Sequence, residues 1–174
     1  MTILHSARLR FEPMSETHYD GLRVLNADPE VMRYISGRPE TPEETRASIA
    51  RVQARWEAFG HSWWSLIEQE TGELVGAGCI QHLGHDPANA LEIGWRLRPD
   101  RQGRGYAIEA AERMARFAFE ELKAPLLTAI CDPDNARSVH VMRKLGMALR
   151  GEEVWHGRPV LAYQVERAAW LARP

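Results

Sequence analysis

The sequence predicts a mixed α/β fold, because segments with an apolar residue at every second position alternate with segments that follow the helical period. The clearest example is residues 91–122. Residues 91–97 alternate between apolar and polar side chains, which is the pattern of a half-buried strand. From Ala107 onward the apolar residues fall on one helical stripe. The chain of 174 residues suits one domain, expected over residues 1–174.

The other elements follow from the same two periods and from residues that begin or end helices. Ser15 and Thr41 precede helical patterns, and Thr41 begins a capping-box sequence. Gly60 and Gly146 are placed to end helices. We expect strands at residues 3–11, 63–68, 74–82, 91–97, 126–131, 147–155 and 160–167. We expect helices at residues 16–26, 29–34, 42–59, 107–122 and 136–145.

The composition argues against several classes of partner. The net charge of −2 gives no overall field that would attract nucleic acid. No apolar run reaches membrane-spanning length, so no membrane partner is expected. The two isolated cysteines, Cys79 and Cys131, fit a reducing compartment and a cytoplasmic location. His82 and His85 lack the spacing of metal ligands, so no metal site is predicted.

The turn between residues 97 and 107 predicts a phosphate site. Two glycines in three residues allow positive φ, so that successive amides can converge on an anion at a helix N-terminus. The third glycine of a dinucleotide fingerprint and the Gly-Lys-Ser/Thr of a Walker loop are both missing. Four arginines surround the turn: Arg96, Arg98, Arg101 and Arg104. The turn itself consists of Gln102, Gly103, Arg104, Gly105, Tyr106 and Ala107.

This Gln-x-x-Gly-x-Ala pattern, after a strand and before a helix, resembles the acyl-coenzyme A signature of the GNAT superfamily of N-acetyltransferases. A second GNAT pattern, Asn-x-x-Ser followed by Lys-x-Gly-Met, matches residues 135–147. The resemblance covers residues 7–170 and is strongest to the Rim-type branch, which acetylates ribosomal proteins. It implies a GNAT-like fold, with a central mixed, mostly antiparallel sheet of about seven strands flanked by helices. It also implies acetyl-coenzyme A (acetyl-CoA) as co-substrate and no metal.

The resemblance assigns roles to individual residues. Acyl transfer to an amine needs a base, and Glu92 is the candidate because it shares a strand face with Gly94; the alternative is a solvent-facing glutamate. Many GNAT members carry a tyrosine as general acid where this chain has Met142, so Ser138 becomes the candidate proton donor; the alternative is a plain first-turn serine. Tyr34 and Trp155 are expected to line the acceptor site. Expected cofactor-binding residues outside the turn are Trp95, Arg96, Leu97, Asn135, Arg137 and Ser138.

We therefore expect an enzyme that moves an acetyl group from acetyl-CoA to a primary amine by direct attack. The acceptor is either a protein N-terminal α-amine or a small-molecule amine. Two alternatives stay open: a non-catalytic acyl-CoA-binding or sensing module, which Met142 favours, and a phosphate-loop nucleotide binder. The oligomeric state is open as well, a homodimer included.

Overall fold

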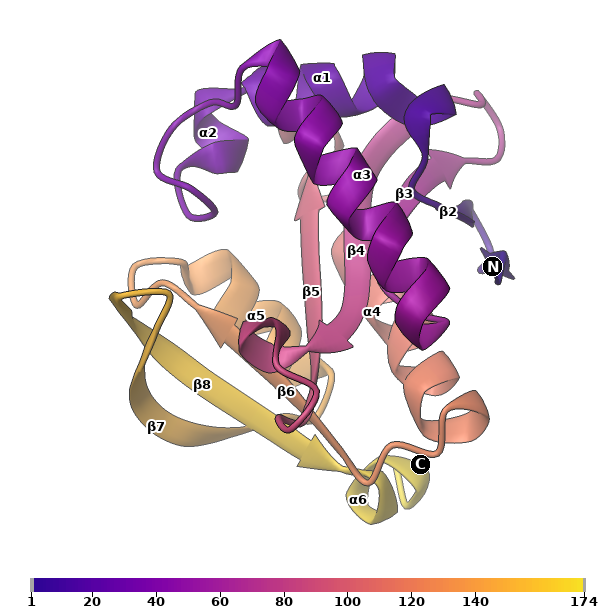
Figure 1. The fold of residues 1–174 in the computed structure, drawn as a ribbon. Helices are drawn as coiled ribbons and strands as arrows, with labels where there is room; N and C mark the ends of the chain where they lie inside the picture. Colours follow the sequence, from indigo (N-terminus) through magenta and orange to yellow (C-terminus); the bar gives the residue numbers. More distant parts are fainter. Residues whose placement is uncertain (1, 174) are drawn as a thin grey trace. The chain divides into compact units, whose positions relative to one another are not determined.

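The computed structural model describes residues 2–173 and has the predicted fold, a single, mostly antiparallel sheet flanked by helices (Figure 1). The sheet has eight strands in the order β1-β2-β3-β4-β5-β6-β8-β7. The strands are β1 (Leu4–His5), β2 (Leu9–Pro13), β3 (Trp63–Glu68), β4 (Leu74–His82), β5 (Leu91–Leu97), β6 (Leu126–Cys131), β7 (Ala148–Trp155) and β8 (Arg158–Glu166). The helices are α1 (Tyr19–Ala27), α2 (Pro29–Met32), α3 (Pro42–Phe59), α4 (Tyr106–Arg116), α5 (Ala136–Lys144) and α6 (Arg167–Leu171).

The chain divides into two compact units, each assembled from separate stretches of sequence. The first unit comprises residues 2–79 and 95–110, and the second comprises residues 80–94 and 111–173. The division runs through β4, β5 and α4. The units are therefore described one at a time.

In the first unit, the predicted strand at residues 3–11 is interrupted, and this accounts for the eighth strand. Ser6 makes the turn between β1 and β2, since its amide donates to the Leu9 carbonyl at 2.9 Å. Its Oγ accepts from the Leu9 amide at 3.2 Å. This side-chain bond competes with the strand ladder, so the chain reverses instead of continuing. The two short strands then pair antiparallel.

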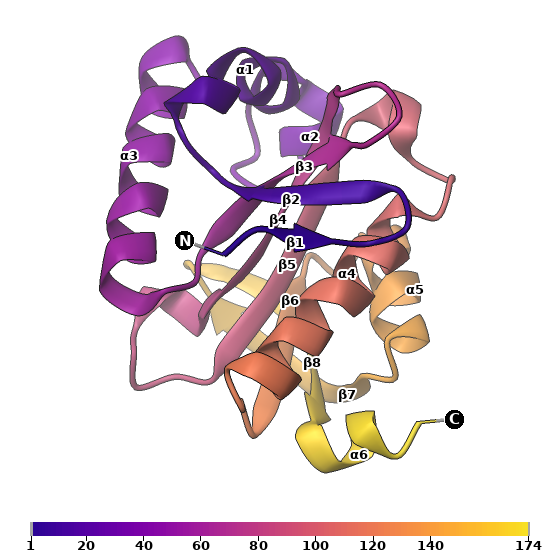
Figure 2. The same cartoon turned by 90° about the vertical axis from the view of Figure 1, so that its right-hand side faces the viewer.

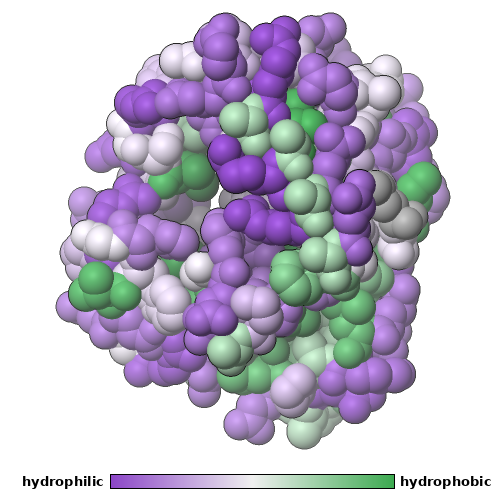
Figure 3. All heavy atoms as spheres, in the orientation of Figure 1, coloured by the Kyte–Doolittle hydropathy of each residue, from purple (hydrophilic) through white to green (hydrophobic). Residues whose placement is uncertain are grey.

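Helix α3 has the predicted bounds because both of its ends are capped. Thr41 Oγ1 accepts from the Glu44 amide at 3.2 Å, and Glu44 accepts from the Thr41 amide at 2.8 Å. Gly60 ends the helix in the left-handed region at φ 72°. In Figure 2 the helix lies on one side of β2–β4, with the start of α4 on the other. Its outer surface is a row of exposed alanines, pale green in Figure 3, between charged residues.

In the second unit, β8 lies between β6 and β7 (Figure 1). Strand β5 runs parallel to β6, and their pairing comprises Leu91 with Leu127 and Glu92 with Thr128. The pairing stops at Glu92, so Gly94 lies beyond the paired stretch. Helix α5 begins where predicted, because the Asn135 side chain accepts from the Ser138 amide at 3.2 Å.

Several helical segments differ from the sequence-based expectation, and α2 ends at Met32, two residues before its expected end. The first predicted helix starts with a 3₁₀ turn at Glu16–His18, and the last turn of the helix after the glycine-rich turn is π-helical at Phe117–Glu121. Helix α6 was not predicted. It is held by contacts distant in sequence: Arg167 Nε donates to the Phe119 carbonyl at 2.9 Å, and the rings of Phe119 and Trp170 lie 5.5 Å apart. No helix within residues 2–173 is long and apolar enough to cross a membrane.

Candidate active site

The glycine-rich turn in the first unit presents a run of backbone amides without protein acceptors. Gly103 and Gly105 have φ of 73° and 83°, as the sequence predicts. Within residues 2–173, the Gln102 amide donates to the Pro99 carbonyl and the Glu109 amide to the Gly105 carbonyl. No protein acceptor is recorded there for the amides of residues 103–108. Six successive donors at the start of α4 suit an anion such as a diphosphate.

Side chains distant in the sequence fix the conformation of this turn. Arg8 Nη1 donates to the Arg104 carbonyl at 3.0 Å, and Arg8 pairs with Glu109 at 2.7 Å. The Tyr106 hydroxyl donates to Glu68, which lies in β3. This hydrogen bond holds the pKa of Glu68 below its usual value and raises the pKa of Tyr106. The start of α4 is thereby tied to β3 and to the turn between β1 and β2.

The arginines predicted to surround the turn differ in whether a carboxylate neutralises their charge. Arg101 pairs with Glu73 at 2.6 Å, and Arg98 pairs with Asp100 at 3.0 Å. Arg104 is exposed and forms no ion pair within the described residues. Arg8 also lies beside the turn, since a Cβ at Gly105 would lie 3.4 Å from its Nη2, but its charge is paired with Glu109. Nothing in the local sequence marks Arg8, because it lies almost a hundred residues before the turn.

The remaining candidates of this region lie on β5 or next to it. Gln102 Nε2 donates to the Leu97 carbonyl at 3.2 Å, so Gln102 closes the loop that leads from the strand into the turn. Leu97 is buried, and Trp95 is half-buried. The guanidinium carbon of Arg96 lies 4.8 Å from the ring centre of Trp63. The predicted contacts of Trp95, Arg96 and Leu97 with a cofactor stay predictions.

Glu92 in the second unit has the properties of a general base. Its carboxylate accepts from Gln81 Nε2 at 3.1 Å. Burial raises the pKa of Glu92 from an ordinary 4.5 to about 7, against the opposing effect of the Gln81 hydrogen bond. The group is therefore poised to exchange a proton near neutral pH. Gln81 was not singled out in the sequence, although a polar residue in the apolar run of β4 is a usable signal.

The start of α5 contains the second group of candidates. Ser138 is the third residue of the helix and is half-buried. No hydrogen bond of its hydroxyl is recorded within residues 2–173, so the hydroxyl is available to a ligand. Met142 is 1% exposed and packs in the core. Arg137 is exposed, and its contact with a cofactor stays a prediction.

The two residues expected in the acceptor site lie in different units. Tyr34 follows α2 in the first unit and is half-buried, with the Arg33 guanidinium 5.1 Å from its ring centre. Trp155 ends β7 in the second unit, and its Nε1 donates to Glu153 at 2.7 Å. Its ring packs against Gly84, where a Cβ would come within 2.9 Å of it. Their role in acceptor binding stays a prediction.

Comparison with known proteins identifies the family. Residues 8–148 match the model of the Acetyltransferase (GNAT) domain. The chain belongs to the GNAT family. A relative, the uncharacterised N-acetyltransferase YnaD of Bacillus subtilis, is 31% identical over 83% of this chain and 81% of its own length. The spermidine N(1)-acetyltransferase of Escherichia coli K12 is 27% identical over 87% of this chain and 78% of its own.

The GNAT fold is also found in a solved ribosomal-protein acetyltransferase. RimL, the ribosomal L7/L12 α-N-protein acetyltransferase, superposes with a TM-score of 0.80. The similarity covers 95% of this chain and 94% of RimL at 21% identity. At that identity the likeness shows the shared fold alone. The predicted membership of the Rim-type branch is therefore not established.

The GNAT family uses acetyl-CoA as co-substrate for acetyl transfer to an amine, so this chain is an acyltransferase. The amides of residues 103–108 fit its diphosphate, because they supply several donors and the positive end of a helix dipole without an internal acceptor. Within residues 2–173 no group of three or more histidine, cysteine, aspartate or glutamate side chains is placed to hold a metal ion.

Proposed function

We propose that this GNAT enzyme transfers the acetyl group of acetyl-CoA directly to a primary amine, with Glu92 as general base. The amine nitrogen attacks the thioester carbonyl, its proton passes to Glu92, and the C–S bond breaks to release the thiol of coenzyme A. Ser138 donates a proton to the departing sulfur. The amides of residues 103–108 hold the diphosphate. A single domain and a cytoplasmic location are part of the same proposal.

The observation that carries the proposal is the environment of Glu92. An amine is mostly protonated at neutral pH, so a base with an ordinary carboxylate pKa would remove its proton inefficiently. Burial raises the pKa of Glu92 to about 7, which brings the carboxylate much closer to the amine in proton affinity. Gln81 holds one carboxylate oxygen and leaves the other to accept a proton.

The test is thiol release from acetyl-CoA in the presence of a panel of amines. Short peptides with varied first residues represent protein N-termini, while spermidine and amino acids represent small acceptors. Release with at least one amine, lost in Glu92→Gln with coenzyme A affinity intact, supports the proposal. Coenzyme A binding without release for any amine indicates a sensing module, which buried Met142 would favour. Stabilisation by ATP or NAD above that by coenzyme A indicates a nucleotide binder.

A further inference from the structure

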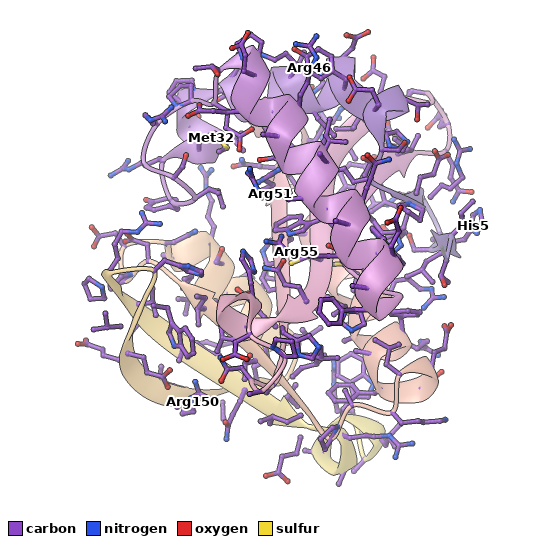
Figure 4. The ribbon with its side chains drawn as sticks, in the orientation of Figure 1. His5, Met32, Arg46, Arg51, Arg55 and Arg150 are labelled. Carbon is purple, nitrogen blue, oxygen red and sulfur yellow. The ribbon has the colours of Figure 1, made fainter. Side chains whose placement is uncertain are left out.

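The turn between β1 and β2, residues 6–8, packs against the start of α4 within the first unit. Strand β1 ends at His5, which is labelled in Figure 4, and Figure 2 shows the turn beside α4. Glu109, in the first turn of α4, joins the two segments. Its Oε1 accepts from Ser6 Oγ at 2.7 Å and from the Arg8 amide at 2.8 Å. Its Oε2 accepts from Arg8 Nε at 2.7 Å, so both oxygens of Glu109 are engaged by the turn.

The Arg8 guanidinium is held on several sides. One edge pairs with Glu109, since Oε2 lies 2.7 Å from both Nε and Nη2. The guanidinium carbon lies 4.2 Å from the ring centre of Tyr106, which is itself buried and donates its hydroxyl to Glu68. The remaining nitrogen, Nη1, donates to the Arg104 carbonyl at 3.0 Å. Because the guanidinium is planar and rigid, these contacts together fix the position of the Nη1 donor.

The bond to the Arg104 carbonyl sets the direction of the Gly105 N–H. The two groups belong to the same planar trans peptide, so they point in opposite directions. With its carbonyl on Arg8, this peptide directs its N–H to the side away from Arg8. The next carbonyl, that of Gly105, accepts from the Glu109 amide at 3.1 Å. Two successive carbonyls are therefore bound within the first unit, and the Gly105 amide stays available to a ligand.

The backbone of Gly105 does not hold this peptide by itself. Its φ is 83°, but glycine adopts positive and negative φ with similar ease. The peptide between Arg104 and Gly105 can therefore rotate by about half a turn without a Cβ clash at Gly105. That rotation would place a carbonyl oxygen where the N–H now points, and the oxygen would repel an anion. The Arg8 hydrogen bond opposes the rotation, because the rotated peptide would lose it.

Arg8 and Arg104 differ in the charge that they present to a ligand. The Arg8 guanidinium is paired with Glu109, so the pair carries no net charge. Arg104 is exposed and forms no ion pair within residues 2–173. Salt screens the attraction between an exposed charge and an anion, but it does not reorient a peptide. The contribution of Arg8 to anion binding is therefore expected to resist salt, and that of Arg104 is not.

We propose that Arg8 is a positioning residue for acetyl-CoA: its hydrogen bond to the Arg104 carbonyl holds the Gly105 N–H in the direction that binds the diphosphate. The inference rests on the proposed binding of the diphosphate by the amides of residues 103–108.

Calorimetric titration with coenzyme A tests the role of Arg8. Arg8→Met keeps an unbranched apolar stem without donors, and Arg8→Gln keeps one polar nitrogen for Glu109 without the arm that reaches Arg104. Each is expected to weaken coenzyme A binding by about tenfold or more, by the same factor at low and at high salt. Wild-type affinity in either variant, or a loss that disappears at high salt, would overturn the inference.

Two other arginines serve as comparisons in the same titration. Arg104→Gln is expected to weaken coenzyme A binding at low salt and much less at high salt. Arg10→Gln is the matched control on β2, because Arg10 pairs with Glu12 at 2.6 Å instead of with α4. It should bind coenzyme A as the wild type does. Each titration is made well below the melting temperature of the variant, so that unfolding is not counted as lost affinity.

An acetyl donor without the diphosphate separates positioning from a general loss of structure. Arg8→Met is expected to raise KM for acetyl-CoA by about tenfold or more, with kcat nearly unchanged. Its kcat/KM for S-acetylpantetheine, which lacks the diphosphate, should equal that of the wild type. An equal loss with both donors would overturn the inference, because a disturbed fold would then account for it.

Gly105→Val distinguishes a failure of this inference from a failure of the proposed function. Coenzyme A affinity retained in Gly105→Val would refute the amides as the diphosphate site, and the role of Arg8 with it. Affinity lost in Gly105→Val but retained in Arg8→Met would overturn the role of Arg8 alone. Coenzyme A binding that Arg8→Met weakens, without transfer to any amine, would refute the proposed acetyl transfer and support the role of Arg8.

Discussion

Replacing Glu92 with glutamine should stabilise the protein at alkaline pH and leave its stability nearly unchanged at acidic pH. The folded-state pKa of about 7 exceeds the ordinary value of 4.5, so the folded state holds the proton more tightly than the unfolded chain does. The contribution of Glu92 to stability is therefore fully present below pH 4.5 and is lost as the pH rises through 7. At about 1.4 kcal/mol for each pKa unit, the loss approaches about 3 kcal/mol at pH 8. Glutamine carries no charge and can still accept the Gln81 hydrogen bond.

The assay is urea unfolding of the wild type and Glu92→Gln at several pH values between 4.5 and 8.5. The difference in the free energy of unfolding should grow with pH and level off above about pH 8. Glu12→Gln is a control of opposite sign, because the hydrogen bond from His18 lowers the pKa of Glu12. That variant should be less stable than the wild type across this range, and the difference should shrink when the pH is lowered below 4.5. A difference for Glu92→Gln that does not vary with pH would refute a buried, proton-binding Glu92. Its turnover at pH 7 should fall by about 10²-fold or more if the carboxylate is the base.

Three further substitutions test the site and its support. Gly105→Val should reduce coenzyme A affinity in calorimetric titration by about a hundredfold, because φ of 83° strains any L side chain and Arg8 lies close by. Gly72→Val carries similar strain in a different turn and should retain the affinity. Gly76→Ala should destabilise the fold by about 1–3 kcal/mol in urea unfolding, since the new Cβ would lie 2.4 Å from the Arg96 carbonyl oxygen; an unchanged midpoint would contradict that close approach. Ser138→Ala should lower kcat by about 10²-fold while coenzyme A affinity persists, and an unchanged kcat would leave Ser138 as a first-turn serine.

The sequence alone predicted the secondary-structure features that depend on residues close together in the chain. Strand alternation and the cap at Thr41 predicted their elements, because the periodicity and the capping bonds are both local. The positive φ of the two turn glycines was predictable for the same reason. Helix α6 was missed because its support comes from Phe119, about fifty residues away.

In the candidate site, too, the sequence identified a residue from its local pattern but did not show the properties that depend on tertiary contacts. Glu92 could be named from its strand face, but its raised pKa depends on burial that the sequence does not display. The Arg8 side chain beside Gly105 comes from the turn between β1 and β2, almost a hundred residues earlier. Gln81 reaches Glu92 only because the end of β4 and the start of β5 come together within the second unit.

The arginines show why a count of basic residues predicts an anion site poorly. Four arginines around the turn appeared equivalent in sequence, yet Glu73 and Asp100 neutralise Arg101 and Arg98. The Arg101–Glu73 pair joins residues 28 positions apart, so its formation depends on tertiary structure. The positive charge available to a ligand is what remains after internal pairing. On that criterion Arg104 stays available beside the diphosphate amides. Arg96, the remaining arginine of that group, has a buried Nε without a hydrogen-bond partner and forms no ion pair within the described residues, so its charge is not neutralised either.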